Sequence, residues 1–464
     1  MLMAILRCIV SAVLILTTLV QHCTMSMSHT DDGALYLTPM IRAGHIVEAR
    51  NACKVVGLLS EEAQSVESYS GYLTVDDIHN SNLFFWFFPA MNDAAVAPVI
   101  LWLQGGPGIP SLYGLFEEHG PFSVSEESGT IELRNHTWVS THSMLYVDNP
   151  VGTGFSFTTD DGYNKDQAAI GRNMYEALLQ FFKLFSEYQK NDFFIAGESY
   201  AGKYVPTLSY IIHQKNPDAS IKINLKGIAI GNGFIDPVNQ VAYGKTLYQY
   251  GVINENEKRK FEELEHIISN QIKDGNYTGA HNTDIELFNN GVFKKLTGLA
   301  TAYNVLSDTE ESFEGIWTYV SHPDVRAALH VGERLLNDGC KARTYLLNDE
   351  MQSVSPCLGA LLDTGLYRVL LYSGQLDIIV PYSGTVMAAR SLRWSGAERF
   401  KNATRTIWRV RASKQDTTDV AGYATTFGPL TMLLVRNTGH MVPSDHPVWA
   451  HEMITRFTSG KPFQ

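Results

Sequence analysis

A serine near the middle of the chain has the local sequence of a candidate nucleophile. Ser199 lies in Gly-Glu-Ser-Tyr-Ala, after the apolar run Phe193–Ala196 and before a helix-like segment. Small residues two positions before and after it, Gly197 and Ala201, allow the tight strand–turn–helix that exposes a hydroxyl above a sheet edge. The pattern alone is weak, because glycine and serine are common residues. Its chemistry would be attack on a carbonyl carbon.

Two further residues bear on this motif. Ser156, in the segment Gly154–Thr158, matches the same pattern, but no helix signal follows it, so we interpret Ser156 as structural. Pro206 comes soon after Ser199. The helix that follows the nucleophile therefore either contains this proline in its first turn or bends there.

A serine hydroxyl needs a base that takes its proton during attack. Asp377 follows V-L-L-Y-S-G-Q-L and His440 follows M-L-L-V-R-N-T-G, so the chain order is Ser, Asp, His. Both preceding runs are strand-like, and Gly374 and Gly439 permit sharp turns after them. We predict that His440 accepts the Ser199 proton and later protonates the leaving group, while Asp377 orients the imidazole.

Single residues of these types usually have structural roles. A lone Asp after a strand is most often a turn or helix-cap residue, and a lone His is most often a hydrogen-bonded core residue. The assignment therefore depends on the joint occurrence of the three residues. The competing histidines are His119, His142, His322, His330 and His446.

Acyl transfer also requires hydrogen-bond donors for the oxyanion that forms during attack. We predict that one donor is the backbone N–H of Tyr200, directly after the nucleophile. The second is assigned to the glycine-rich segment 102–108 (W-L-Q-G-G-P-G), with Gly106 as the donor and Gly105 beside it. Glycine lets a backbone N–H approach a substrate without an intervening Cβ. The alternative is a plain tight turn, since Pro-Gly is a common turn signal.

Strand-like and helix-like runs alternate around these residues, which predicts an α/β-hydrolase fold with a mixed central sheet and covering helices. Apolar residues at helical spacing predict helices within 164–190 and 448–457. Expected strands are a pair within 70–89, then 98–103, 144–147, 193–196, 225–231, 369–372 and 432–435.

Four segments are expected along the chain. Residues 1–25 are predicted to be a signal peptide, because the apolar run 8–20 is short for a membrane span and follows Arg7. An N-terminal membrane anchor is the alternative. The polar, irregular segment 234–317 is expected to form an inserted helical cap. The hydrolase core would then comprise 35–233 and 318–464.

Composition excludes several classes of protein. The formal net charge is −12 and no cluster of five Lys or Arg occurs, which argues against a nucleic-acid partner. Hydrophobic residues make up 45% and charged residues 18%, so a large core is expected. No second long apolar run predicts stable membrane insertion. No H-E-x-x-H or Cys/His cluster indicates a metal, and no cofactor is expected.

Glycosylation sequons agree with a secretory leader, and together they predict a secreted or lysosomal protein. Five cysteines occur, of which Cys8 would leave with the leader. Cys340 and Cys357 flank a polar stretch and could close a local disulfide, whereas Cys53 and Cys23 stay unassigned. The sequons are at Asn135, Asn276 and Asn402.

Seven segments occur in an order that resembles the serine carboxypeptidase family. The resemblance extends from about Ser70 to Phe457. Gln104, the segment 118–121 and G-Q-L-D-I-I-V make the chain most similar to vitellogenic-like carboxypeptidases within that family. The segments are W-L-Q-G-G-P-G (102–108), P-V-G-T-G-F-S (150–156), G-E-S-Y-A-G-K-Y-V-P (197–206), G-N-G (231–233), P-D-V-R-A-A-L-H-V (323–331), G-Q-L-D-I-I-V (374–380) and G-H-M-V-P (439–443).

The resemblance implies a peptidase that removes C-terminal residues from peptides or proteins with a free C-terminus, through an acyl-enzyme on Ser199. It also implies a hydrogen-bonded network for the substrate's terminal carboxylate. Two departures from the family occur: Gln104 replaces the usual Asn, and Ile109-Pro110-Ser111 replaces Cys-Ser-Ser. The network residues would be Trp102, Gln104, Gly105, Glu118 and Glu198.

The two glutamates of this network predict acidic activity. If both Glu118 and Glu198 were ionised, they would repel a carboxylate, so at least one must hold a proton. We therefore expect raised pKa values and the highest activity at acidic pH. Two other functions are compatible with the sequence: an acyltransferase, in which an alcohol intercepts the acyl-enzyme, and a non-catalytic binding or protective protein. The sequence also leaves a homodimer open.

Overall fold

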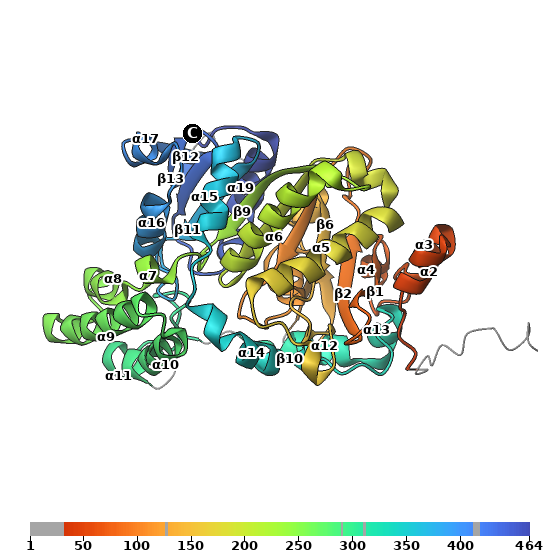
Figure 1. Cartoon of the computed structure of the whole chain (residues 1–464), viewed down its shortest axis with the longest axis horizontal. Coiled ribbons are helices and arrows are strands. Elements are labelled where there is room, and N and C mark those ends of the chain that lie inside the picture. Colours follow the sequence, from red (N-terminus) through yellow and green to blue (C-terminus); the bar gives the residue numbers. More distant parts are fainter. Residues whose placement is uncertain (1–31, 126–128, 289–290, 310–311, 412–417) are drawn as a thin grey trace, which may run out of the picture.

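The computed structural model describes residues 32–125, 129–288, 291–309, 312–411 and 418–464 (Figure 1). The predicted signal peptide lies outside the described residues, as do Cys8 and Cys23. The dominant element of the described part is a ten-stranded sheet with the order β1-β2-β6-β3-β8-β9-β11-β14-β13-β12. Its strands are β1 (Tyr69–Asp76), β2 (Ser81–Phe88), β3 (Val99–Leu103), β6 (Ser143–Val147), β8 (Phe193–Glu198), β9 (Leu225–Gly231), β11 (Arg368–Gly374), β12 (Arg405–Arg411), β13 (Thr418–Phe427) and β14 (Leu430–Val435).

The sheet is mixed, as predicted. The central strands β6, β3, β8, β9, β11 and β14 are parallel to one another, and the outer strands β1, β2, β13 and β12 pair antiparallel. Two small ribbons lie outside the sheet: β4 (Phe122–Val124) with β5 (Ile131–Leu133), and β7 (Thr153–Gly154) with β10 (Asn337–Asp338).

Helices cover both faces of the sheet and extend to one end of it (Figure 1). They begin and end as follows: α2 (Thr38–Ala43), α3 (Ile46–Ala52), α4 (Glu61–Gln64), α5 (Gln167–Leu184), α6 (Ala201–Lys215), α7 (Pro237–Gln240), α8 (Tyr243–Tyr250), α9 (Glu255–Lys273), α10 (Tyr277–Phe288), α11 (Val292–Thr297), α12 (Glu314–Ser321), α13 (Pro323–Ala328), α14 (Cys340–Glu350), α15 (Ser355–Thr364), α16 (Tyr382–Ser391), α17 (Ala397–Lys401), α18 (Val442–Asp445) and α19 (Pro447–Ser459). No helix among the described residues has the length and apolar character that a membrane crossing requires.

The central strands are apolar throughout because both of their faces are buried. In β3, Leu101 points into the core beneath α5 and α6, whereas Ile100 and Trp102 point into the core beneath α19. The predicted strands and the helices within 164–190 and 448–457 are confirmed. Pro206 lies inside α6, which begins at Ala201.

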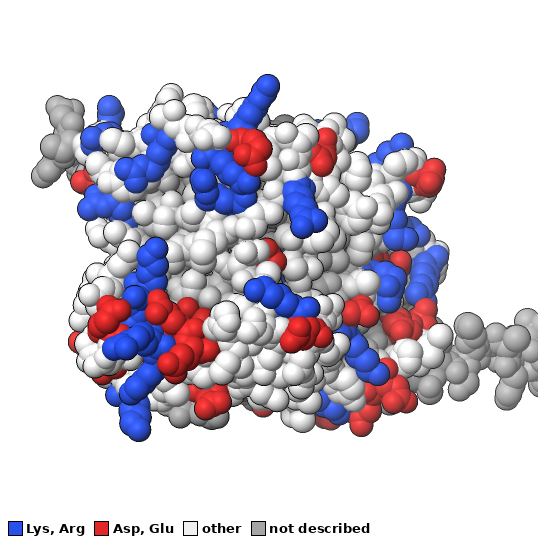
Figure 2. Space-filling model, turned by 60° about the vertical axis from the view of Figure 1, so that its left-hand side comes forward, with Lys and Arg blue, Asp and Glu red and all other residues white. Residues whose placement is uncertain are grey.

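Strands β12 and β13 had no predicted counterpart. Only Trp408 and Val410 of β12 are buried, and its arginines are exposed, so the strand has no continuous apolar run. Lys and Arg gather over the upper part of the face in Figure 2, where α17 and β12 lie. Exposed cations along an edge strand disfavour pairing with another sheet.

The segment 234–317 contains helices α7 to α11 and the first half of α12, and helices α7 to α11 extend beyond the carboxyl ends of the strands (Figure 1). These helices have a separate apolar core that includes Leu247, Phe261 and Leu287. Leu376 and Ile378, which follow β11, belong to the same core. The helical segment is therefore packed directly on the loop that carries Asp377.

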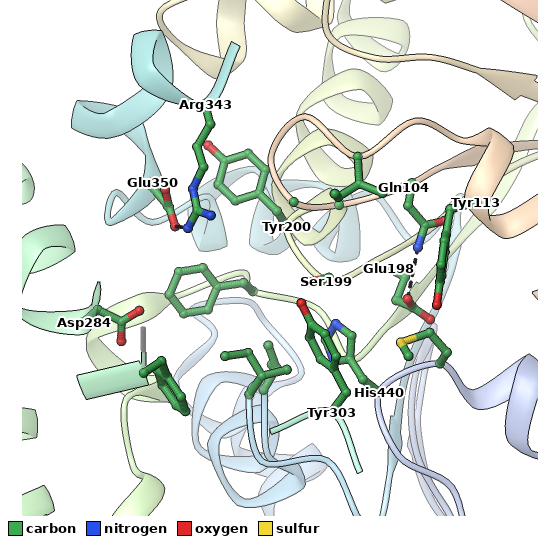
Figure 3. Close-up of a pocket in the computed structure, with 18 of the residues that line it drawn as sticks. Gln104, Tyr113, Glu198, Ser199, Tyr200, Asp284, Tyr303, Arg343, Glu350 and His440 are labelled. Atoms are coloured by element: carbon green, nitrogen blue, oxygen red, sulfur yellow. Dashed lines mark hydrogen bonds and ion pairs between the residues drawn. The ribbon is translucent and has the colours of Figure 1, made fainter. Parts of the chain in front are cut away.

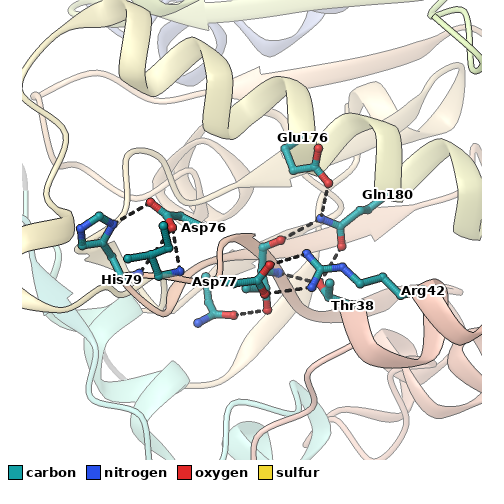
Figure 4. Close-up of polar contacts among 10 residues, drawn as sticks. Thr38, Arg42, Asp76, Asp77, His79, Glu176 and Gln180 are labelled. Atoms are coloured by element: carbon teal, nitrogen blue, oxygen red, sulfur yellow. Dashed lines mark hydrogen bonds and ion pairs between the residues drawn. The ribbon is translucent and has the colours of Figure 1, made fainter.

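Polar contacts attach the N-terminal helices to the sheet (Figure 4). Arg42 on α2 makes two hydrogen bonds of 2.9 Å to the Asp77 carboxylate in the β1–β2 turn. The Thr38 hydroxyl donates to Gln180 Oε1 on α5 at 2.6 Å and accepts from the Thr74 N–H at 2.7 Å. Helix α2 is thus attached both to the β1–β2 turn and to α5.

The predicted disulfide between Cys340 and Cys357 is wrong. Both residues are free thiols, as is the buried Cys53. Cys340 is exposed at the start of α14, whereas Cys357 lies partly buried in α15. The intervening helix carries the chain roughly 15 Å before it can turn back, far beyond the Cα separation of a disulfide.

Candidate active site

Ser199 stands at the sharp turn between β8 and α6. Its φ of +61° is in the left-handed region, which is costly for a residue with a side chain. Backbone hydrogen bonds maintain this turn: Ser199 N–H donates to Gly231 O at 3.0 Å, and Phe234 N–H donates to Ser199 O at 2.9 Å. A Cβ at Gly197 would lie 2.6 Å from Leu103 O and 2.8 Å from the Ala201 Cβ, so the position requires glycine.

Asp377 and His440 are paired in the structure. His440 Nδ1 lies 2.8 Å from Asp377 Oδ2, and both side chains are buried. The Asp377 carboxylate also accepts hydrogen bonds from the N–H groups of Ile379 (2.9 Å) and Val380 (3.2 Å) and from Asn232 Nδ2 (2.6 Å). These four contacts fix the orientation of the carboxylate that holds the imidazole.

Asn232 has a role that the sequence analysis missed. It lies directly after β9 with a φ of +43°, and its Oδ1 accepts from the N–H of Gly374 at 3.2 Å. Its side chain thus connects the end of β9 to the end of β11 and to Asp377. The sequence did contain a sign of this role: Asn232 is the polar residue of the G-N-G segment, directly after an apolar strand. Asparagine tolerates positive φ better than most residues.

The loop of His440 has a support of its own. Asp445 Oδ2 accepts hydrogen bonds from Gly439 N–H at 2.5 Å and from Asn304 Nδ2 at 3.2 Å. His440 N–H donates to Tyr303 O at 2.7 Å, and the Tyr303 ring stacks on the imidazole with centroids 5.1 Å apart. The imidazole is therefore positioned from both the sheet and the segment before α12.

Ser199 and His440 line the same cavity, which has a volume of about 220 Å³ (Figure 3). No hydrogen bond between their side chains occurs among the described contacts. Such bonds often form only in the substrate complex. His440 is the single histidine among the described residues that line this cavity, so none of the competing histidines lies where a base is needed.

The predicted oxyanion donors lie beside the nucleophile. A Cβ at Gly105 would lie 2.7 Å from both the Ser199 Cβ and the Tyr200 nitrogen. Gly106 has a φ of +111°, which only glycine adopts readily. Gly105, Gly106 and Tyr200 all line the cavity. Glycine is therefore required here for the close approach of this loop to the nucleophile.

The five residues predicted for carboxylate binding come together in the structure. Trp102 Nε1 donates to Gln104 Oε1 at 2.7 Å. The amide nitrogen of Gln104 then donates to Glu118 Oε1 at 3.0 Å and to Glu198 Oε1 at 3.1 Å. All four side chains are buried, and Gly105 is next to Gln104 in the loop. Gln104 and Glu198 line the same cavity as Ser199.

Both buried glutamates have raised pKa values. Burial raises the pKa of Glu118 to about 7, although the hydrogen bond from Gln104 favours its charged form. Burial also raises the pKa of Glu198 well above its ordinary value, and the negative charge of Glu118 raises it further. The remaining oxygens, Glu118 Oε2 and Glu198 Oε2, have no hydrogen-bond partner among the described residues. The pair can therefore offer a proton to a third carboxylate.

The remaining residues singled out in the sequence lie outside the cavity of Ser199. Ser156 Oγ donates to Asp148 O at 2.6 Å and accepts from Phe84 N–H at 2.8 Å, so it is a buried structural residue. His119 is buried with its ring stacked on Trp138, and burial lowers its pKa well below the usual value. The sequon residues Asn135, Asn276 and Asn402 are all exposed.

The parallel central sheet and the nucleophile on the strand–helix turn define the class as α/β-hydrolase. A profile described as "Serine carboxypeptidase" matches residues 59–460. The chain is 46% identical to "Venom serine carboxypeptidase" of Apis mellifera, covering 94% of this chain and 93% of that protein. It is 42% identical to "Vitellogenic carboxypeptidase" of Aedes aegypti, covering 91% and 89%.

The structure agrees with these matches. Its fold is similar to the crystal structure of the Saccharomyces cerevisiae prohormone-processing carboxypeptidase Kex1, with a TM-score of 0.75 at 23% identity, covering 89% of this chain and 96% of that one. The chain belongs to the serine carboxypeptidase family and is a serine-type carboxypeptidase.

Proposed function

We propose that this enzyme hydrolyses the C-terminal peptide bond of peptides and proteins, and that it is most active at acidic pH. The observation that carries the proposal is the buried Gln104–Glu118–Glu198 network, which opens into the cavity of Ser199. A free terminal carboxylate can accept charge-assisted hydrogen bonds there through two oxygens, whereas a continuing peptide chain offers a single uncharged carbonyl oxygen. The enzyme would therefore act at chain ends.

The reaction follows from the positions of three side chains. Because His440 Nδ1 is paired with Asp377, Nε2 is left to accept the Ser199 proton. Ser199 Oγ bonds to the carbonyl carbon, and the oxyanion accepts hydrogen bonds from the N–H groups of Gly106 and Tyr200. The C–N bond breaks as His440 gives its proton to the leaving amine. Water, deprotonated by His440, then releases the acyl group from Ser199.

The acidic preference follows from the glutamate pair. With a pKa of about 7 at Glu118 and a pKa of Glu198 raised well above its ordinary value by burial and by the charge of Glu118, protons are held on the pair at acidic pH and can be donated to the substrate carboxylate. As the pH rises through 7, Glu118 ionises and repels that carboxylate. Substrate binding, and with it kcat/KM, should weaken.

The test is digestion of N-blocked dipeptides with free or amidated C-termini at several pH values, with Ser199→Ala as the inactive control. Cleavage of the free-acid peptides alone, strongest at acidic pH, is expected. Equal cleavage of amidated peptides would remove the exopeptidase assignment. Adding an alcohol acceptor and analysing the products tests the acyltransferase alternative, in which ester would form in preference to acid.

The proposal extends to the compartment. The predicted leader at 1–25 and the three exposed sequon residues support a secreted or lysosomal protein. Expression in insect or mammalian cells, followed by peptide-N-glycosidase treatment, should lower the apparent mass. An unglycosylated, cell-retained product with residues 1–25 still attached would contradict this assignment.

A further inference from the structure

The cavity of Ser199 continues on the side away from the glutamate pair. In Figure 3, Gln104 and Glu198 lie on one side of Ser199, and Asp284, Arg343 and Glu350 lie on the other. If the substrate's terminal carboxylate binds at the glutamate pair, as proposed above, the leaving residue occupies that side. The side chain of the residue before the scissile bond must then extend toward Asp284. The inference therefore rests on the proposed function.

The walls of this second half of the cavity are largely apolar. Phe234, Tyr243, Ile285 and Phe288 line the cavity. Tyr243 is hydrogen-bonded to Asp284, and its ring contacts the Phe288 ring with centroids 4.8 Å apart. Tyr243, Ile285 and Phe288 come from cap helices, so the cap shapes this part of the cavity. Apolar walls suit the methylene stem of a long side chain whose polar group lies at its tip.

The charges at the end of the cavity lined by Asp284, Arg343 and Glu350 are unequal. Glu350 is 7% exposed, with Oε1 3.5 Å from the Arg343 guanidinium and Oε2 3.1 Å from His281 Nδ1. Burial alone would raise the pKa of Glu350, but these two partners outweigh burial and hold the pKa below its ordinary value. Glu350 and Arg343 therefore form a pair with little net charge.

Asp284 is the carboxylate of this group that has no ion-pair partner within the described part of the chain. Its Oδ1 accepts a weak hydrogen bond from the Tyr243 hydroxyl at 3.3 Å. Among the described residues, no Lys, Arg or His nitrogen forms an ion pair with it. Burial, and then the negative charge of Glu350, raises the pKa of Asp284 to about 7. An acidic side chain in this state gains most from a cationic partner.

We propose that Asp284 determines specificity for a substrate with Lys or Arg immediately before the scissile bond. The aliphatic stem of that residue would pack between Phe234, Tyr243 and Phe288, and its cationic tip would pair with Asp284. Arg343 does not favour an acidic substrate, because Glu350 already neutralises it. The proposal names the substrate class of the active site and the residue that selects it.

A pH dependence follows from the same arrangement. The titratable and charged groups that face Asp284 are Glu350 and Arg343 on α14, Tyr243 on α8 and His281 on α10 itself. Below its pKa Asp284 is neutral and distinguishes poorly between a cationic and an apolar side chain. As it ionises, the preference for the cation should grow, even while overall activity declines through Glu118.

The experiment compares kcat/KM for N-blocked Xaa-Phe dipeptides in which Xaa is Lys, Arg, norleucine or Glu. Norleucine retains the stem of Lys without its charge. The Lys-to-norleucine ratio cancels the shared effect of the glutamate pair, and it should rise about tenfold between about pH 5 and 7.5. Asp284→Asn should lower the Lys and Arg values about tenfold near neutral pH, with norleucine within about twofold of wild type.

A matched control is Glu286→Gln. Glu286 is exposed on the same helix and outside the cavity, so this variant removes one negative charge without changing the Lys-to-norleucine ratio. Norleucine cleavage by Asp284→Asn reports whether that variant folds. If Asp284→Asn does not fold, the change of the wild-type Lys-to-norleucine ratio with pH tests the role of Asp284 instead.

The outcomes separate the two proposals. Failure of the wild-type enzyme to cleave any of these dipeptides would remove the exopeptidase assignment itself. Cleavage of norleucine as fast as Lys at neutral pH, or a Lys-to-norleucine ratio unchanged by Asp284→Asn, would overturn the role of Asp284 alone. A preference for Glu that is lost in Arg343→Gln would overturn it in favour of Arg343.

Discussion

Asn232 Nδ2 lies 2.6 Å from Asp377 Oδ2, and the same carboxylate oxygen lies 2.8 Å from His440 Nδ1. A single oxygen atom is thus held in place by the amide and holds the imidazole in turn. The amide side chain starts at the end of β9 and the carboxylate lies after β11, so the contact joins two neighbouring parallel strands. We therefore propose Asn232 as a positioning residue for His440, the proposed catalytic base.

Replacing Asn232 should affect the chemical step more than binding. Asn232→Ala removes a buried hydrogen bond from Asp377, and we expect kcat to fall about 10- to 100-fold with KM within about threefold. The measurement is steady-state kinetics on a blocked dipeptide. Asn270→Ala, at an exposed site on α9, is the matched control and should leave kcat and KM unchanged. An equal loss in kcat and rise in KM would point to general unfolding of the site.

Glu118→Gln should change the pH profile. The pKa of Glu118 is raised to about 7, so the donor form dominates below that pH and is lost above it. The glutamine amide donates at every pH, and kcat/KM should therefore fall less steeply between about pH 6 and 8 than in the wild type. Glu132→Gln, at an exposed site, serves as the control. An unaltered decline in Glu118→Gln would remove Glu118 as its cause.

Gln104→Ala should weaken recognition of the terminal carboxylate. The amide makes three buried hydrogen bonds, to Trp102, Glu118 and Glu198. Its removal leaves those groups unpaired, which should lower the free energy of unfolding by about 1–3 kcal/mol. KM for free-acid peptides should rise about 10-fold or more, whereas hydrolysis of a simple ester without a carboxylate should change little. Parallel losses on both substrates would contradict a binding role.

Gly105→Ala should inactivate the enzyme without unfolding it. The added Cβ would lie 2.7 Å from Glu198 O, the Ser199 Cβ and Tyr200 N, so the loop of the second oxyanion donor must move away. Loss of one oxyanion donor lowers kcat about 10²- to 10³-fold. Thermal unfolding and circular dichroism would establish that the fold is retained. Gly57→Ala, which meets no atom within 4 Å although its φ is +85°, is a control that adds a methyl group without a steric clash and should leave kcat unchanged.

Much of the fold was predictable from local patterns. The apolar runs of β3, β8, β9 and β11 are buried on both faces, so the sequence signal is strong. Edge strand β12 was not predicted because only two alternate residues, Trp408 and Val410, are buried, and the exposed Arg409 lies between them. The Cys340–Cys357 pairing failed because sequence separation carries no information on where two helices place their thiols.

By itself the sequence determined the chemical identity of the site. The order of Ser199, Asp377 and His440, each after an apolar strand, indicates a serine hydrolase, because parallel strands bring their carboxyl ends to one edge of the sheet. Only the tertiary structure decided which other groups share that edge. The contact of Asn232 with Asp377, and the excess charge of Asp284 beyond the nucleophile, depend on side chains from separate strands and cap helices. Their positions follow from long-range packing, which no local pattern encodes.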